Sequence, residues 1–188
     1  MQQYFGIKKE DKILYLNDED FNHIKNVMRM KEGTKLLVVY NSITYLCSLN
    51  KDLKSAVIVE KMGSKNENDI IAYIPILQEE KMSFVIEKGT ELGITKFVPV
   101  EFENFKYKLK KDIIEKKIKR WNKIAKAAAE QSRRTIIPEV LYPCGVDNIC
   151  SNSDVKLLCS LDKKSVKPIS EVLTKNNVLD TISLVFGP

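Results

Sequence analysis

Five polar side chains of different chemistry stand in a row at residues 130–134. They are an acid, an amide, a hydroxyl and two guanidinium groups, in the order Glu130, Gln131, Ser132, Arg133 and Arg134. A carboxylate or amide can accept or orient a proton in a reaction, and guanidinium groups can bind phosphate oxygens. The same composition is also typical of a frayed, solvated helix end, so the pattern alone leaves both interpretations open.

A long amphipathic helix leads into this polar segment. Trp121, Ala125 and Ala128 continue an apolar stripe that begins at Ile114 and Ile118, at steps of three and four residues. The stripe predicts a helix over residues 112–134, which a following proline closes off. The five polar side chains therefore lie near the carboxyl end of this helix.

A run of basic side chains precedes the helix and continues into it. Residues 106–120 hold eight basic and two acidic residues, an excess equal to the chain's net charge of +6. A local cationic stripe favours a polyanionic partner, because contacts to phosphates release counterions. A solvated, lysine-rich helix face explains the same composition, so this stretch alone does not decide between the two.

The composition is that of a globular protein without a membrane segment. The chain has 188 residues, of which 44% are hydrophobic and 30% are charged. No apolar run reaches the length of a membrane span, and residues 1–20 lack the core of a signal peptide. We therefore expect a cytoplasmic protein with no membrane partner.

The cysteine and histidine content argues against a metal centre. The chain has four cysteines and one histidine, His23, and no two cysteines form a CxxC pair. Zinc sites in proteins need such groups of ligands, so we expect no metal. Reduced thiols without a catalytic role are the simpler interpretation of Cys47, Cys144, Cys150 and Cys159.

Residues 1–69 have the pattern of a small β-rich unit. Short β-prone segments stand at residues 4–7, 13–16, 36–40, 44–49 and 56–62, and a helical segment at residues 21–30 follows an acidic lead. Several short strands with one helix predict a compact barrel, whose edges must close or be covered. The polar, turn-rich residues 63–69 predict a domain boundary.

Residues 70–188 change to an alternation of strands and helices. We expect strands at residues 70–77, 96–100, 155–161 and 181–186, and helices at residues 80–92, 112–134 and 168–173. Pro99 predicts a strand end or an edge position for its strand. The alternation predicts right-handed βαβ units and a largely parallel sheet with helices on its faces, so the expected fold class is α/β.

Ligand sites in such a sheet are expected at the strand ends. The common GxGxxG and GxxxxGK[ST] nucleotide signatures are absent from the sequence. Ligands of open α/β sheets bind beyond the carboxyl ends of the strands, so candidate places follow Val100 and Leu161 and include Gly187-Pro188. A Gly-Pro turn after a strand can hold a planar or charged ligand, although a plain turn is the simpler interpretation.

Three stretches taken together resemble one family. They are residues 23–30 (HIKNVMRM), 81–93 (KMSFVIEKGTELG) and 120–134 (RWNKIAKAAAEQSRR). They resemble the 16S ribosomal RNA uridine-N3 methyltransferases of the SPOUT, or trefoil-knot, class. That family has a histidine followed by an Arg-Met pair, a helix reading E/Q-K-x-T/S-E-L-G, and a helix reading R-W-x-x-I-A-x-x-A-x-E-Q. Here these marks stand as His23 with Arg29-Met30, as Glu87 to Gly93, and as Arg120-Trp121 through Glu130-Gln131.

The resemblance covers the whole chain and implies a fold and an activity. It implies a PUA-like RNA-binding β-barrel over residues 1–69 and a SPOUT-type α/β trefoil-knot methyltransferase domain over residues 70–188. It implies S-adenosylmethionine as the methyl donor. The implied substrate is a uridine near the decoding centre in the 16S rRNA of the small ribosomal subunit. It also implies a homodimer in the full-length form.

The resemblance further implies candidate residues for the methyl donor and for the reaction. The family builds its donor pocket from the loop after the strand at residues 155–161, from a Gly-Pro-Glu-Gly-Gly turn and from a third loop nearer the C-terminus. This places Leu161, Gly187 and Pro188 at the cofactor. Glu130 and Gln131 are candidates for assisting loss of the uridine N3 proton, with positioning of the loops around the knot as the favoured alternative.

RNA contacts are implied for basic residues of both expected domains. The candidates are Arg29, Lys106, Lys108, Arg133 and Arg134, because guanidinium and ammonium groups bind phosphates. Contact with RNA and a structural role in the N-terminal domain are equally good interpretations of His23. Glu91 is expected to support the fold.

The chain departs from the family pattern in two places. It stops at Gly187-Pro188, the first two residues of the Gly-Pro-Glu-Gly-Gly turn, so we expect the third loop and the last helix of the knot to be missing. Gln3 stands where relatives tend to carry an arginine, which removes one expected RNA contact. Besides an active enzyme, the sequence therefore leaves open a non-catalytic RNA-binding or ribosome-associated remnant and an incomplete fragment of a longer enzyme.

Overall fold

The computed structural model describes residues 1–64, 68–102, 111–149, 153–159, 166–174 and 181–187. The chain forms two units. The first comprises Met1–Asn66 together with Ala129–Ile136, and the second comprises Glu67–Ala128 together with Ile137–Pro188. Each unit has its own cluster of buried hydrophobic residues.

The first unit is a curled six-stranded sheet. Its strands are β1 (Gln3–Phe5), β2 (Lys8–Glu10), β3 (Ile13–Tyr15), β4 (Lys35–Tyr40), β5 (Ile43–Leu49) and β6 (Ser55–Ser64), in the order β1-β4-β5-β6-β3-β2. Only Gly6 and Ile7 separate β1 from β2, yet these strands stand at opposite ends of the order, so the sheet must close on itself. The Gly6 N–H donates to the Val39 carbonyl (2.8 Å) and the Ile7 N–H to the Tyr15 carbonyl (2.9 Å), which joins the two ends.

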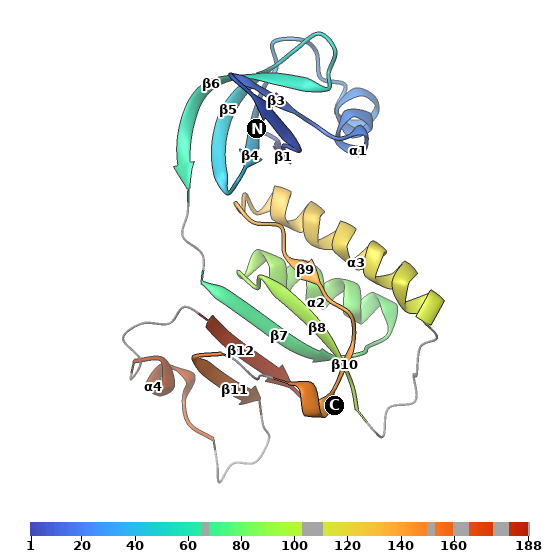
Figure 1. The fold of residues 1–188 in the computed structure, drawn as a ribbon, viewed down its shortest axis with the longest axis vertical. Coiled ribbons are helices and arrows are strands. Elements are labelled where there is room, and N and C mark those ends of the chain that lie inside the picture. The colour runs from blue at the N-terminus through green and yellow to red at the C-terminus, as the bar shows by residue number, and fades with distance from the viewer. Residues whose placement is uncertain (65–67, 103–110, 150–152, 160–165, 175–180, 188) are drawn as a thin grey trace. The chain divides into compact units, whose positions relative to one another are not determined.

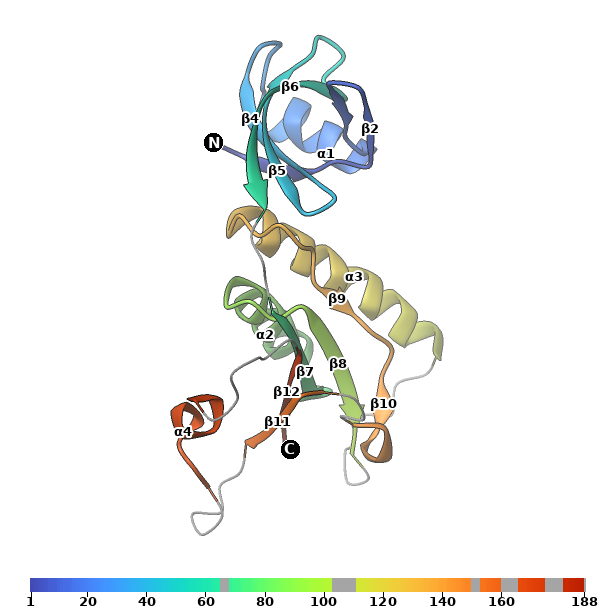
Figure 2. The ribbon, with the colours of Figure 1, turned by 60° about the vertical axis from the view of Figure 1, so that its left-hand side comes forward.

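A short helical segment accompanies this barrel. Helix α1 (Asp18–Asn22) begins at Asn17, whose side chain accepts a hydrogen bond of 2.8 Å from the Asp20 N–H. The chain continues directly as the π-helix η1 (His23–Val27). Figure 2 shows the strands curving round in a ring, with α1 inside its outline. The sequence predicted one helix over residues 21–30, but the acidic lead is itself helical and the helix ends before Arg29.

The second unit is built on a parallel sheet (Figure 1). Its strands are β7 (Asp69–Pro75), β8 (Lys96–Glu101), β9 (Glu139–Val140), β10 (Cys144–Gly145), β11 (Val155–Cys159) and β12 (Thr181–Phe186). The order is β10-β8-β7-β12-β11, with β9 also paired to β8, and every pair is parallel. Its helices are α2 (Glu79–Glu91), α3 (Lys111–Gln131), the 3-10 helix η2 (Val146–Asn148) and α4 (Ile169–Thr174). The predicted α/β class and the curled N-terminal β-sheet are confirmed.

Helices α2 and α3 cover one face of this sheet. Their buried side chains pack with residues of β7, β8 and β9 in one core that includes Ile86, Phe97 and Trp121. The apolar stripe predicted for the long helix faces this core, because Ile114, Trp121 and the other residues of the stripe are all buried. Among the described residues, none of the helices is long and apolar enough to span a membrane.

The position of Pro99 differs from the prediction. Its strand, β8, lies inside the sheet, between β7 on one side and β9 and β10 on the other. Strand β9 pairs with Lys96 and Phe97, and β10 pairs with Val100 and Glu101, so the partner strand is interrupted beside Pro99. Proline cannot donate a ladder hydrogen bond, and this break in the partner makes the donor unnecessary.

Candidate functional site

The carboxyl ends of β11 and β12 form the edge of the second unit at which the sequence predicts ligand binding. The strands are parallel neighbours, and Cys159 pairs with Phe186, so both end at the same level. Ligands of open parallel sheets bind beyond such ends. Gly187 follows β12 and is exposed, and among the described residues no heavy atom other than its chain neighbours lies within 4 Å of where a Cβ would stand. The described residues therefore leave the backbone at Gly187 accessible.

The described part of this edge leaves the backbone at Gly187 open to a ligand. Open space beside a glycine lets backbone N–H and C=O groups contact a ligand directly, which is how small-molecule sites often fix orientation. Of the residues predicted at the cofactor, Gly187 lies at this edge. Leu161 and Pro188 lie outside the described residues.

A pocket of about 480 Å³ adjoins the same edge. It is formed by the edge strand β11 and by residues 166–172, and it includes Cys159 at the end of β11. Its apolar side chains are Leu157, Leu158, Val166, Ile169 and Val172, and its cations are Lys156 and Lys167. Leu158, Val166 and Ile169 are each more than half exposed, so this pocket is an open hollow at the surface.

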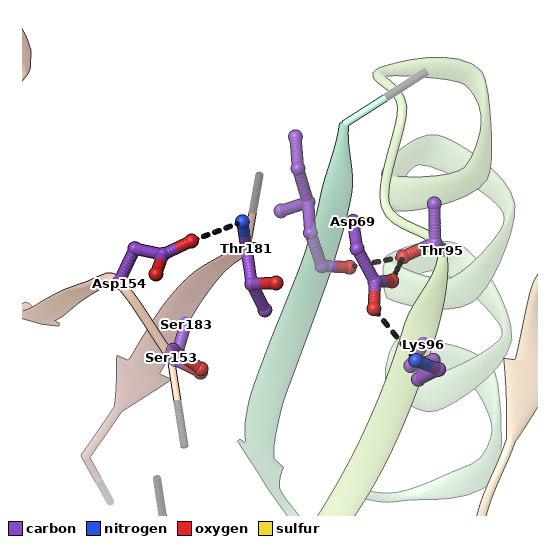
Figure 3. A network of polar contacts seen from close by, with 8 residues as sticks. Asp69, Thr95, Lys96, Ser153, Asp154, Thr181 and Ser183 are labelled. Atoms are coloured by element: carbon purple, nitrogen blue, oxygen red, sulfur yellow. Dashed lines mark hydrogen bonds and ion pairs between the residues drawn. The ribbon is translucent and has the colours of Figure 1, made fainter. Parts of the chain in front are cut away.

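The opposite, amino-terminal edge of the sheet carries a network of polar contacts (Figure 3). Asp69, at the start of β7, accepts hydrogen bonds from the Thr95 hydroxyl and from Lys96 Nζ, the latter at 2.7 Å. On the neighbouring strands, Asp154 Oδ2 accepts a hydrogen bond of 2.9 Å from the Thr181 N–H. These contacts fasten the starts of β7, β8 and β12, so this edge has a structural role.

Replacing Asp69 by asparagine is expected to destabilise the protein at neutral pH and to matter less in acid. Partial burial raises the pKa of Asp69, but the hydrogen bonds from Lys96 and Thr95 outweigh it and hold the pKa below its usual value. The carboxylate therefore stabilises the fold above the unfolded-state pKa of about 3.9, and this contribution is lost as the pH falls through the lower folded-state pKa. Urea unfolding of both proteins at several pH values measures the difference.

The ion-pair partner supplies the control for this prediction. In a double-mutant cycle with Lys96→Met, the effect of Asp69→Asn should shrink, because Lys96 is the charged partner. A stability difference that stays constant from neutral pH to below the unfolded-state pKa contradicts the prediction.

A carboxylate in the first turn of α2 joins that helix to α3. Glu79 Oε1 accepts a hydrogen bond of 3.1 Å from Trp121 Nε1 and lies 3.5 Å from Arg120 Nε, and Oε2 pairs with Lys117. Burial raises the pKa of Glu79, but these partners, Lys117 foremost, outweigh it and hold the pKa below its usual value. The Arg-Trp pair of the sequence motif therefore secures the packing of α3 in the second unit.

The polar segment at the end of α3 belongs to the first unit. The Arg134 N–H donates to the Ala129 carbonyl (2.9 Å) and the Arg133 N–H to the Glu130 carbonyl (3.4 Å), with Arg133 at φ 57°. This is the Schellman arrangement that ends many helices. Gln131 and Arg133 are exposed, whereas only 6% of Arg134 is exposed. Burial of Arg134 favours a structural role for it and leaves Arg133 as the arginine of this pair that faces solvent.

Strand β1 binds this returning segment. Gln3 is buried, and its Nε2 donates a hydrogen bond of 2.8 Å to the Arg134 carbonyl. Burial raises the pKa of Tyr4, and the charges of the Glu130 and Asp20 carboxylates raise it further. Glu130 belongs to the segment Ala129–Ile136 of the first unit. Gln3 has a structural role in place of the RNA contact expected for an arginine.

His23 also meets Tyr4. The Tyr4 hydroxyl and His23 Nδ1 share a hydrogen bond of 3.1 Å, and the two rings are in an edge-to-face arrangement with centroids 5.9 Å apart. This contact supports the structural interpretation of His23, and its contact with RNA stays a prediction. Arg29 follows on the exposed end of η1, and Lys106 and Lys108 lie outside the described residues. Glu91 accepts a hydrogen bond of 2.8 Å from Lys88 on the same helix.

The polar contacts around β1 and Asp69 were missed by sequence reasoning. The pairing of Gln3 with Arg134 joins residues 131 positions apart, and neither residue type signals the other. Asp69 and Lys96 stand at the starts of two strands that the sequence predicted. Knowledge of the register between these two strands would have indicated their ion pair.

Comparison with protein families gives two adjacent matches. Residues 64–188 match a model described as an RNA methyltransferase domain, and residues 16–61 match one described as an RNA methyltransferase PUA domain. Together the two models span most of the chain in the order of its two sheets.

Two relatives are named ribosomal RNA small subunit methyltransferase E. The protein of Mesomycoplasma hyopneumoniae (strain 232) is 32% identical over 163 residues, which are 84% of this chain and 70% of that protein. The protein of Bacillus subtilis (strain 168) is 35% identical over 152 residues, which are 75% of this chain and 59% of that protein. The chain therefore spans only part of the length of these relatives.

A solved structure shares the fold. It is a methyltransferase of Legionella pneumophila in complex with the bound cofactor SAM, with a TM-score of 0.80 and 22% identity. The match covers 99% of this chain and 79% of that chain. At this identity the likeness shows the arrangement of the strands and helices.

Proposed function

We propose that this chain takes part in the transfer of a methyl group from S-adenosylmethionine to a base of ribosomal RNA, because it belongs to the RNA methyltransferase family. The specific acceptor is N3 of a uridine in the 16S rRNA of the small subunit. The match of residues 64–188 to the methyltransferase model carries this proposal. The open carboxyl edge beside Gly187 supports it, because a ligand can reach the strand ends there.

The methyl donor contributes an electrophilic methyl group on a sulfonium. The chain's own residues must hold it in line with the base, and the backbone at Phe186 and Gly187 is the part described here that can do so. The pocket beside β11 offers an apolar surface next to the same strand end. Leu161 and Pro188 complete this proposed cofactor set.

Removal of the uridine N3 proton needs an acceptor. Glu130 and Gln131 remain the proposed candidates, with positioning of the loops around the knot as the favoured alternative. RNA contacts are proposed for Arg29 and Arg133, which are exposed, and for Lys106 and Lys108. Arg134 is proposed to support its neighbours through the backbone contact with Gln3.

The wider assembly is also part of the proposal. In a chain of the relatives' length, we infer a knotted methyltransferase domain that acts as a homodimer on the small ribosomal subunit in the cytoplasm. The two domain boundaries of the sequence interpretation, residues 1–69 and 70–188, belong to this proposal. Both family models agree with an RNA-binding module followed by a catalytic one.

Gly187→Val is expected to weaken S-adenosylmethionine binding at least tenfold while leaving thermal stability unchanged. The added side chain meets no atom of the described chain but occupies the space proposed for the ligand. Isothermal titration calorimetry of the parent and the variant measures the affinity. Gly145→Val is the matched control, because a Cβ there also meets nothing and β10 lies three strand positions from β12, about 14 Å away.

The activity itself is tested by nucleoside analysis. The parent chain and a chain of the relatives' length are incubated with S-adenosylmethionine and small subunits that lack the modification. N3-methyluridine in the digested 16S rRNA supports the proposal. If the longer chain binds the donor but yields another methylated nucleoside, the assigned position is wrong. If neither folded chain binds the donor, the methyltransferase proposal fails.

A further inference from the structure

Five consecutive side chains at the end of η1 are exposed, although two of them are apolar. Residues 25–29, the η1 tip, read Lys-Asn-Val-Met-Arg, and each of the five is exposed. Val27 is 66% exposed and Met28 is 43% exposed. A single exposed apolar side chain is common on a protein surface, whereas adjoining ones among polar residues mark a place of contact with another molecule.

The η1 tip is fixed at both of its ends. Ile24, just before it, is fully buried, and Met30, just after it, packs against the same hydrophobic core. The Met28 N–H donates to the His23 carbonyl (2.9 Å) and the Met30 N–H to the Ile24 carbonyl (3.0 Å). A π-helical turn inside a helical segment is uncommon and occurs frequently at functional sites. Because the tip is held in this way, it loses little conformational entropy when it contacts a partner.

The charge around the two apolar side chains favours a polyanion. The tip and its neighbours carry Lys25, Arg29 and Lys31, and residues 23–31 contain no acidic residue. The acidic side chains of this helical segment stand at its opposite end, in the first turn of α1. Apolar side chains between cations suit a nucleic acid, because each base has an apolar face and the backbone is anionic.

We propose that Val27 and Met28 pack against the face of an unpaired base of the RNA substrate. The inference rests on the proposed function, because it takes RNA as the substrate, and it adds a base to the phosphate contact proposed for Arg29. Unpaired bases can leave the stack and pack against side chains, whereas the bases of a duplex cover one another. Methionine suits this contact, because its polarizable sulfur interacts favourably with aromatic rings. The η1 tip therefore makes the first unit selective for unpaired RNA.

A double variant that removes the apolar surface and keeps the charge tests this proposal. Val27→Thr with Met28→Gln preserves the approximate size of both exposed side chains. Its affinity for a short labelled uridine oligonucleotide should fall about tenfold, in the range of one lost base contact. The salt dependence of binding should stay the same, because no cation is removed. A labelled RNA duplex with the same number of phosphates should bind as it does to the parent.

Binding is followed by fluorescence anisotropy of the 188-residue chain without methyl donor, and thermal unfolding is recorded for each variant. The matched control is Val59→Thr with Met62→Gln, which makes the same two changes on β6 of the same unit. Val59 is 53% exposed and Met62 is 60% exposed, and this control should leave RNA binding unchanged. Met28→Leu should keep the parental affinity, because the apolar surface remains.

The outcomes separate a contact with bases from other roles of the η1 tip. If the folded double variant binds both RNAs as the parent does, the inference is wrong while the proposed function stands. If its affinity for the duplex falls by the same factor as for the oligonucleotide, the tip contacts only the backbone and the inference is overturned. Binding lost only together with a lower unfolding temperature assigns the two side chains a stabilising role, which also overturns it.

Two further results concern the partner. If free RNA binds the double variant normally but assembled small subunits bind it more weakly, the tip contacts a ribosomal protein and the inference is wrong. If the folded parent binds neither RNA, both the inference and an RNA-binding role for this chain fall. Calorimetric titration with S-adenosylmethionine then tests the methyl-donor part of the proposed function independently.

Discussion

Replacing Trp121 by alanine is expected to destabilise the second unit by about 3–5 kcal/mol, the usual cost of removing a large aromatic side chain from a core. Trp121 is fully buried and is the largest such side chain in the protein. It packs with residues of both α2 and the sheet, so its removal leaves a cavity that several elements must close together. Its Nε1 also donates to Glu79, and the variant deprives that carboxylate of one donor.

Urea unfolding followed by far-UV circular dichroism measures the effect. Trp121 is the single tryptophan of the chain, so its fluorescence cannot report on the variant. Trp121→Phe should lower the free energy of unfolding by less, because most of the apolar volume stays although the hydrogen bond to Glu79 is lost. Leu92→Ala is a suitable control, since this large apolar residue is 84% exposed and its loss should change stability by less than about 0.5 kcal/mol. Equal unfolding midpoints for Trp121→Ala and the parent would rule the prediction out.

The core around Trp121 could be predicted from the sequence because its signal is local. Steps of three and four residues place the apolar side chains on one side of any helix, whatever surrounds it. The structure confirms that this side is buried, and the strand over residues 181–186 agrees with β12 at both ends. These elements carry their pattern within one segment, so no partner is needed to identify them.

Other parts depend on contacts between distant segments and could not be predicted. Strand β2 consists of Lys8, Lys9 and Glu10, which show no apolar alternation, and it exists because β3 pairs with it. The return of residues 129–136 to the first unit depends on Gln3, and no periodicity reveals that destination. The sequence predicted a strand end or an edge position for Pro99, because proline cannot donate to a continuous partner strand. In the structure the partner on that side is broken into β9 and β10, which the sequence did not indicate.

The same difference between local patterns and contacts of distant segments applies to the candidate site. Gly187 was predicted at the cofactor from the turn after a strand and from the family resemblance, and that role stays a prediction. The structure places Gly187 directly after β12, where it is exposed. The separate environments of Arg133 and Arg134 were not foreseeable, because exposure of adjacent residues depends on how the helix end is fastened. A sequence motif thus located the segment, while the fold decided which of its two arginines faces solvent.

Replacing Gly89 by valine is expected to destabilise the second unit by about 3 kcal/mol, the upper part of the range for overpacking a core. Gly89 lies in α2, in the middle of the Glu-Lys-Gly-Thr-Glu-Leu-Gly motif. A Cβ there would stand 2.7 Å from Phe97 Cε1 and 2.9 Å from both Phe97 Cζ and Ile94 Cδ1. Phe97 is fully buried, so its ring has little room to move away. Glycine is thus required at position 89 by the close approach of α2 to β8.

Alanine at the same position separates packing from helix propensity. Alanine favours a helix over glycine by about 1 kcal/mol, so an uncrowded site would be stabilised by Gly89→Ala. We expect a net loss, because even one methyl group meets the Phe97 ring. Ala127→Val, at an exposed position of α3, controls for the cost of a β-branched residue in a helix. Replacing the Phe97 ring by the smaller leucine side chain should restore part of the lost stability when Phe97→Leu is combined with the Gly89 substitution. If the two changes in the free energy of unfolding are strictly additive, Gly89 and Phe97 do not compete for the same space.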